Sequence, residues 1–122
     1  MRNHRLLIVD DSNFIRSKIA RSLGESGVEI VGLASNGVKA VASFDKLRPD
    51  VVTMDLTMPE MDGLECIRQL RRRDPKVRIL VVSALADKSD AIQALKAGAQ
   101  GFLCKPFTEQ ELSEAIHELL ED

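Results

Sequence analysis

The sequence predicts an α/β fold in which a parallel sheet carries helices on both faces. Short apolar runs alternate five times with helical patterns along the chain, and such alternation is typical of βα repeats. Four of the five runs lack the polar alternation of a half-exposed strand, so we expect both of their faces to be covered. The length of 122 residues and the 44% of apolar residues are enough for one core, which indicates one domain over residues 1–122.

The apolar runs are the predicted strands. The second run contains Glu29 and Gly32, so we expect it to be less completely covered and to lie at an edge of the sheet. The other four are expected to be buried between helices. The five predicted strands cover residues 6–9, 28–34, 51–54, 77–82 and 102–104.

Between the strands, apolar residues recur with helical spacing and predict five helices that face the core. Their ends carry recognisable signals: Ser12 and Asn36 can cap the first two helices, and Gly98 can close the fourth. Thr108 and Glu111 form a capping box before the last. The five apolar stripes are Ile15, Ile19, Ala20 and Leu23; Val41, Phe44 and Leu47; Leu64, Ile67 and Leu70; Ala91, Ile92 and Leu95; and Leu112, Ala115, Ile116 and Leu119.

The net charge, the lengths of the apolar runs and the cysteine spacing exclude several kinds of function. A net charge of -2 gives no electrostatic basis for nonspecific binding to nucleic acid, and the basic triplet at residues 71–73 is interpreted as a helix end. The apolar run after the first residues is too short for a signal peptide, and no run is long enough to span a membrane. Cys66 and Cys104 lack metal-ligand spacing, so we expect reduced, buried thiols and a cytoplasmic protein.

Charged and hydroxyl residues follow the ends of four predicted strands, and this is the most informative feature of the chain. Asp10 and Asp11 follow the first strand, Asp55 the third, Ser83 the fourth and Lys105 the fifth. Parallel strands end at the same edge of a sheet and lie about 4.8 Å apart, so these side chains should converge. Crowded carboxylates raise one another's pKa unless a cation neutralises them. Mg²⁺ (or Mn²⁺) favours such an oxygen site together with a phosphate.

The same residues suggest phosphoryl chemistry. A carboxylate can attack phosphorus and become an aspartyl phosphate, and Asp55 on the central strand is the candidate nucleophile. Phosphoryl transfer otherwise needs a cation and hydrogen-bond donors around the phosphoryl oxygens, which Lys105 and Ser83 can supply. Pro106 makes a cis peptide bond possible after Lys105, and that bond would direct the lysine.

This set of residues, with the turn at 58–63 after Thr57, closely resembles the CheY-like receiver domain of bacterial two-component response regulators. The resemblance extends from Leu6 to the last helix. It implies a flavodoxin-like sheet of five parallel strands in the order 2-1-3-4-5, with five helices on both faces. In sequence, residues 9–16 and 54–63 most resemble the chemotaxis branch of the family, which includes the receiver half of methylesterases.

The resemblance also implies a role for each matching residue. Asp55 resembles the phosphoacceptor, Lys105 the lysine that contacts the acyl phosphate, and Ala84 the small residue whose backbone N–H meets the phosphoryl group. Ser83 and Phe102 stand at the switch positions. The implied Mg²⁺ ligands are Asp10, Asp11, Asp55 and the backbone carbonyl of Thr57, and the implied cis peptide joins Lys105 and Pro106.

The resemblance implies a phosphorylation-activated signalling protein rather than an enzyme with an external substrate. A histidine kinase or phosphotransfer protein would donate the phosphoryl group, and the protein would catalyse only its own phosphorylation and dephosphorylation. A downstream protein would bind the face formed by the fourth helix, fifth strand and fifth helix. Such a receiver can stand alone or belong to a longer regulator.

Two alternatives belong to other classes. An aspartyl-phosphate phosphatase of the haloacid-dehalogenase type needs a second Asp two residues after its nucleophile, where this chain has Thr57. A flavodoxin-like flavin carrier shares the strand order but needs a phosphate-binding loop where Asp10 and Asp11 would repel a phosphate. The chain also has no Trp or Tyr to stack on a flavin.

Overall fold

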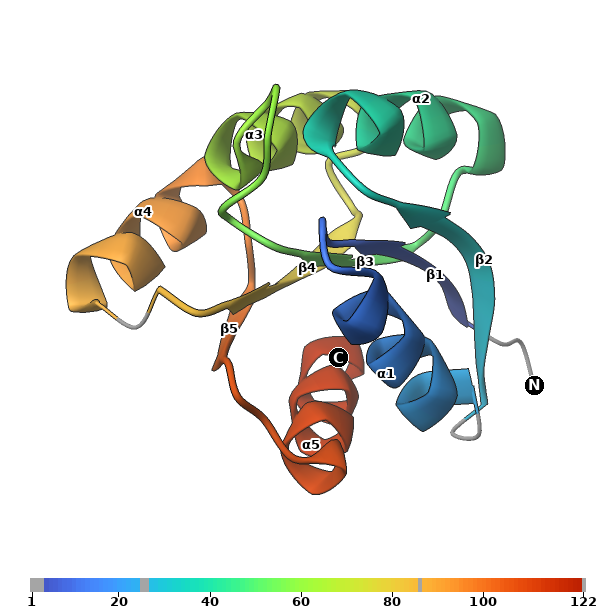
Figure 1. Ribbon diagram of the computed structural model, residues 1–122. Coiled ribbons are helices and arrows are strands. Elements are labelled where there is room, and N and C mark those ends of the chain that lie inside the picture. The colour runs from blue at the N-terminus through green and yellow to red at the C-terminus, as the bar shows by residue number, and fades with distance from the viewer. Residues whose placement is uncertain (1–3, 25–26, 86, 122) are drawn as a thin grey trace.

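The computed structural model describes residues 4–24, 27–85 and 87–121, in which strands and helices alternate along the chain (Figure 1). The strands are β1 (His4–Val9), β2 (Val28–Ala34), β3 (Val51–Met54), β4 (Arg78–Ser83) and β5 (Gly101–Cys104). The helices are α1 (Asn13–Gly24), α2 (Gly37–Leu47), α3 (Gly63–Arg73), α4 (Lys88–Ala97) and α5 (Glu109–Leu120).

The strands form one parallel sheet in the order β2-β1-β3-β4-β5. The α/β fold class and the strand order expected from the sequence are therefore confirmed, as is the edge position of the second strand. The expectation for the fifth strand was wrong. Residues 101–103 are only half-buried and Cys104 is exposed, because β5 forms the other edge of the sheet.

Helices cover both faces of this sheet, with α1 and α5 on one side and α2, α3 and α4 on the other (Figure 1). Two separate apolar cores result. One packs Phe44 and Ile67 against inward side chains of the strands, and the other packs Ile19 and Leu112 against the opposite face. The central strand β3 is buried along its whole length. Asp55, which follows it directly, is therefore also shielded from solvent.

The predicted helix ends are also present. Asn36 Oδ1 accepts a hydrogen bond from the N–H of Lys39 at 2.8 Å, and Ser12 Oγ accepts one from Ile15 at 3.2 Å. Thr108 caps α5 through a complete capping box. Gly98 closes α4 with a φ of 129°, a backbone conformation that favours glycine. These caps fix where each helix starts or ends relative to the sheet.

Gly63 is required where α3 begins, because a side chain there would collide with the end of β3. A Cβ would lie against the carbonyl oxygen of Asp55 and 2.5 Å from the Cα of Leu56. We expect Gly63→Ala to lower the free energy of unfolding by about 1–3 kcal/mol through overpacking, measured by urea denaturation. Gly24→Ala is the matched control, because a Cβ there meets no atom within 4 Å. Equal stabilities of the two variants would contradict this account of Gly63.

The two cysteines lie in different surroundings, which corrects the expectation that both are buried. Burial raises the pKa of the Cys66 thiol to about 12, whereas Cys104 is exposed on the edge strand. Since the thiolate is the reactive form, we expect iodoacetamide to alkylate Cys104 in the folded protein and to spare Cys66 until denaturant is added. Peptide mapping measures this, and equal labelling of both thiols in the folded state would contradict the burial.

Candidate functional site

Three carboxylates meet at the carboxyl edge of the sheet. Asp10 and Asp55 follow β1 and β3 directly and are each 1% exposed, whereas Asp11 is exposed. One oxygen of each carboxylate lies within 4.8 Å of the other two. The sheet itself holds them there: Asp10 N–H donates to Ala34 and Asp55 N–H donates to Val9, each at 3.0 Å. The predicted convergence of Asp10, Asp11 and Asp55 is therefore present.

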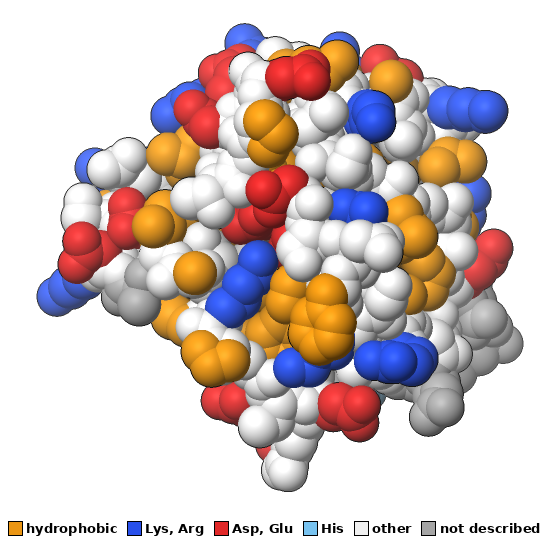
Figure 2. All heavy atoms as spheres, in the orientation of Figure 1, with side chains coloured by type: hydrophobic (Ala, Val, Ile, Leu, Met, Phe, Trp, Pro, Cys, Tyr) orange, Lys and Arg blue, Asp and Glu red, His pale blue; other side chains and the backbone are white. Residues whose placement is uncertain are grey.

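Lys105 brings a cation to this cluster from the end of β5. Its Nζ lies 2.7 Å from Asp10 Oδ2 and 3.8 Å from Asp55 Oδ1. Its backbone N–H donates to the carbonyl of Ser83 at 2.8 Å, and the following bond to Pro106 is cis, the isomer that the resemblance implies. In Figure 2, acidic side chains with a basic one beside them gather near the middle of the face shown.

The balance of charge remains negative, because three carboxylates face one ammonium group. Burial raises the pKa of Asp55 to about 6, Asp10 adds to this rise, and Lys105 opposes it. Such a surplus of negative charge favours binding of a further cation. Carboxylate oxygens are the donors that Mg²⁺ prefers, and it is held in proteins by one or two carboxylates with waters and phosphate. The residues present therefore fit a magnesium site.

Thr57 contributes a contact that the sequence did not predict. Its backbone N–H and its Oγ1 donate to Asp55 Oδ1 at 3.3 and 3.4 Å, so Thr57 helps to orient the carboxylate. Ser83 is fully buried at the end of β4, and its Oγ accepts a hydrogen bond from Leu85 N–H at 3.1 Å. Ala84, between them, is exposed. The loops after β3 and β4 thus each contain a hydrogen bond between residues two positions apart, at 3.3 and 3.1 Å.

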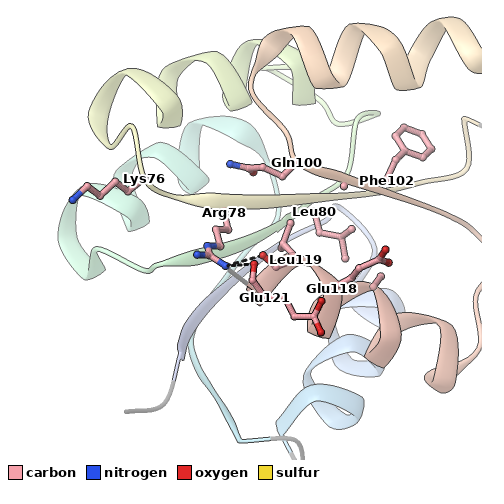
Figure 3. Close-up of a pocket in the computed structure, with 10 residues that line it drawn as sticks. Lys76, Arg78, Leu80, Gln100, Phe102, Glu118, Leu119 and Glu121 are labelled. Atoms are coloured by element: carbon pink, nitrogen blue, oxygen red, sulfur yellow. Dashed lines mark hydrogen bonds between the residues drawn. The ribbon is translucent and has the colours of Figure 1, made fainter. Parts of the chain in front are cut away.

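Phe102 lies apart from the carboxylates. It is half-buried on β5, packs against the core under α2, α3 and α4, and contributes to the lining of a pocket of about 580 Å³ (Figure 3). This pocket opens between α5 and the amino-terminal halves of β4 and β5, where Arg78 donates to the carbonyl of Leu119 at 2.9 Å. The charged site is at the opposite ends of the strands. The chemistry of the carboxylate cluster, rather than this pocket, identifies the candidate site.

Comparison with known proteins agrees with this geometry. The family model for the response regulator receiver domain matches residues 6–117. The chain belongs to the response regulator receiver domain family. It is 44% identical over 117 residues to the chemotaxis protein CheY of Bacillus subtilis, covering 96% of this chain and 98% of that protein. It is thus a CheY-like receiver domain of the two-component type, with close relatives in chemotaxis.

Solved structures give the same result. The CheX-CheY-BeF3-Mg+2 complex from Borrelia burgdorferi contains a chain that superposes with a TM-score of 0.94 at 29% identity, covering 98% of this chain and 90% of that one. Receiver domains also occur within larger proteins. The protein-glutamate methylesterase/protein-glutamine glutaminase of Alkalilimnicola ehrlichii is 46% identical over 107 residues, which are 27% of its length. The flavodoxin-like sheet is confirmed, while membership of this family gives no support to a flavin carrier or a haloacid-dehalogenase phosphatase.

Two contacts near the site were missed by the sequence analysis, one of which had a recognisable signal. Asp62 Oδ1 caps α3 by accepting from Glu65 N–H at 2.9 Å, and the Asp-Gly pair at 62–63 was the signal for that turn. Arg16 donates to the carbonyl of Asp10 at 2.6 Å, a contact that no sequence pattern indicates.

In the described part of the chain, no helix is both long and apolar enough to cross a membrane.

Proposed function

We propose that this chain is a phosphorylation-activated switch in which Asp55 accepts a phosphoryl group from a histidine kinase or a phosphotransfer protein. The observation that carries the proposal is the buried Asp55 carboxylate, 3.8 Å from Lys105 Nζ and clustered with Asp10 and Asp11. An Asp55 oxygen attacks phosphorus, the bond from phosphorus to the donor imidazole breaks, and the imidazole leaves as the phosphoryl group becomes an acyl phosphate. Residues 1–122 form one receiver domain in this proposal.

The metal would be held by Asp10, Asp11, Asp55 and the backbone carbonyl of Thr57, directly or through water. Bound there, Mg²⁺ (or Mn²⁺) would neutralise the charge on the phosphoryl oxygens. Asp10 is held by two partners, since its Oδ2 accepts from Lys105 and its Oδ1 accepts from Ser12 N–H at 2.9 Å. Asp11 is exposed at the mouth of the cluster, which favours direct access to an ion from solvent.

Three further groups bind the phosphoryl group in this proposal. Lys105 supplies a positive charge that lies near both buried carboxylates, and the hydroxyl of Ser83 and the backbone N–H of Ala84 supply donors from the end of β4. The Ser83 hydroxyl now accepts from Leu85. An accepting hydroxyl can still donate its own proton, so Ser83 can turn that proton toward a phosphoryl oxygen. We infer that this attraction draws Ser83 toward the phosphoryl group and reshapes the loop between β4 and α4.

The reshaped loop would cause the change in affinity for a downstream protein. We infer that movement of Ser83 lets the half-buried Phe102 turn inward, which changes the face of α4, β5 and α5. On α4, Ile92 is 43% exposed and Leu95 is 52% exposed, so the prediction that they face the core was wrong. Exposed apolar side chains of this kind can be covered by a downstream protein. The phosphoryl group thereby biases a two-state surface toward binding its target.

The proposed role is that of a signalling module of the cytoplasm. It catalyses only its own phosphorylation and dephosphorylation, and its partners are proteins rather than nucleic acid or membrane. The net charge of -2 is consistent with this choice of partners. Intact mass spectrometry after incubation with acetyl phosphate tests the function: we expect the gain of one phosphoryl group with Mg²⁺ and none with a chelator. An unchanged mass at saturating Mg²⁺ would contradict it.

The two acidic residues of the first loop should contribute unequally to metal binding. We expect Asp11→Ala to weaken Mg²⁺ affinity by about tenfold or more, and Asp10→Ala to weaken it less, if Asp11 is a direct ligand and Asp10 acts through water. Isothermal titration with MgCl₂ measures both affinities, and equal values for the two variants would refute the division of roles.

A further inference from the structure

A contact outside the carboxylate cluster also holds the loop that carries Lys105. Lys18, on α1, donates a hydrogen bond from Nζ to the carbonyl oxygen of Phe107 at 2.8 Å. The same Nζ lies 4.5 Å from the centre of the Phe107 ring, where a cation–π attraction adds to the hydrogen bond. The two residues are 89 positions apart in sequence. One side chain therefore joins α1 to the connection between β5 and α5.

The joined segment is the one that positions Lys105. Phe107 follows Lys105 by two residues, across the cis bond, and is only 4% exposed within the core that contains Leu112. The Phe107 backbone is thus held from two sides, by its buried ring and by the ammonium group of Lys18. Lys18 itself is half-buried, so its apolar stem packs along the helix surface while its charged end reaches the loop.

The same helix is joined to Asp10 by Arg16, which donates to the Asp10 carbonyl at 2.6 Å. Ser12, directly before α1, adds a bond from its N–H to Asp10 Oδ1 at 2.9 Å. The ion pair between Asp10 and Lys105, at 2.7 Å, therefore joins two segments that α1 also contacts. Arg16 contacts Asp10 itself, and Lys18 contacts Phe107, two residues after Lys105.

We propose that Lys18 is a positioning residue for phosphorylation: it holds the connection between β5 and α5 so that Lys105 stays within reach of Asp55. The inference rests on the proposed function. Phosphoryl transfer depends on placement of charge around the transferred group, and small displacements of a positioned group are costly in rate. When the connection between β5 and α5 is held in place, Lys105 is already positioned before the phosphoryl donor binds.

The test compares Lys18→Met with Lys18→Arg under saturating acetyl phosphate and Mg²⁺. Met keeps the apolar stem and the helix propensity but removes the ammonium group, so we expect the phosphorylation rate constant to fall about tenfold. Mg²⁺ affinity should stay within about twofold, because the carboxylates of the site are unchanged. Arg donates to carbonyls and stacks on aromatic rings, so Lys18→Arg should recover the rate. Lys46→Met, an exposed charge loss on α2, is the matched control and should match the parent.

A rate for Lys18→Met equal to that of the parent would overturn the proposal. So would a Lys18→Arg variant as slow as Lys18→Met, because a contact needed only for packing would not be restored by the second cation. If Lys18→Met does not fold, Lys18→Gln replaces it with the same expected direction. If the parent itself gains no phosphoryl mass, the proposed function fails and this inference with it. A normal parent with an unaffected Lys18→Met variant refutes only the inference.

Discussion

Asp55→Asn is expected to abolish the Mg²⁺-dependent gain of a phosphoryl group. The substitution keeps the shape of the side chain and removes the nucleophilic oxygen charge at the end of the buried strand β3. The amide can still accept from Thr57 through its oxygen, as the carboxylate does now, so the fold should persist. Intact mass after incubation with acetyl phosphate measures the loss, which should be complete.

The control for this prediction is Ser83→Ala. Ser83 is buried, and its hydroxyl bonds within its own loop, so its removal should leave the phosphoryl gain largely present while weakening the response of the output face. A full gain of mass in Asp55→Asn would refute the assignment of Asp55. A complete loss in Ser83→Ala would contradict the division between acceptor and switch.

The lifetime of the acyl phosphate is expected to be long, and Thr57→Asn with Leu85→Glu should shorten it by about 10²-fold. These positions follow Asp55 and Ser83 by two residues each. Thr57 already uses its hydroxyl and N–H on Asp55, at 3.4 and 3.3 Å, and Leu85 places an apolar side chain, 37% exposed, on the loop after β4. Neither residue offers an amide or carboxylate that could orient an attacking water.

Leu85 should contribute the larger share of this effect, because an apolar side chain beside the phosphoryl group also excludes water. The single variants separate the two contributions, with dephosphorylation followed by mass after removal of the donor and with Mg²⁺ saturating. A double variant that loses its phosphoryl group at the rate of the parent, or more slowly, would show that these two positions do not set the lifetime in this protein.

Much of the fold could be predicted because its signals are local. Apolar runs specify strands, and residues such as Asn36 and Thr108 specify helix starts through hydrogen bonds with neighbours three positions away. Polar residues after the strands were sufficient to predict which side chains would meet, since parallel strands bring their ends together. Asp10, Asp11, Asp55 and Lys105 are therefore found together as expected.

The features that could not be predicted from the sequence depend on contacts between distant residues. Cys104 sits in an apolar run yet is exposed, because only the strand order reveals that β5 is an edge. The bond from Lys18 to Phe107 joins segments 89 residues apart, and a single lysine on a helix carries no sign of such a partner. The elevated pKa of Asp55 has causes of both kinds. Burial, the largest cause, depends on the assembled sheet, whereas the repulsion by Asp10 was expected from the meeting of the strand ends.

The central claim is that Asp55 accepts the phosphoryl group, and chemical mapping of the modified residue tests it most directly. Borohydride reduces an acyl phosphate to an alcohol, so the parent protein, phosphorylated by acetyl phosphate with Mg²⁺ and then reduced, should contain homoserine in place of aspartate at one position. Peptide mass mapping should place it at position 55. Homoserine at position 10 or 11, or no homoserine in protein that has gained the phosphoryl mass, would contradict the account.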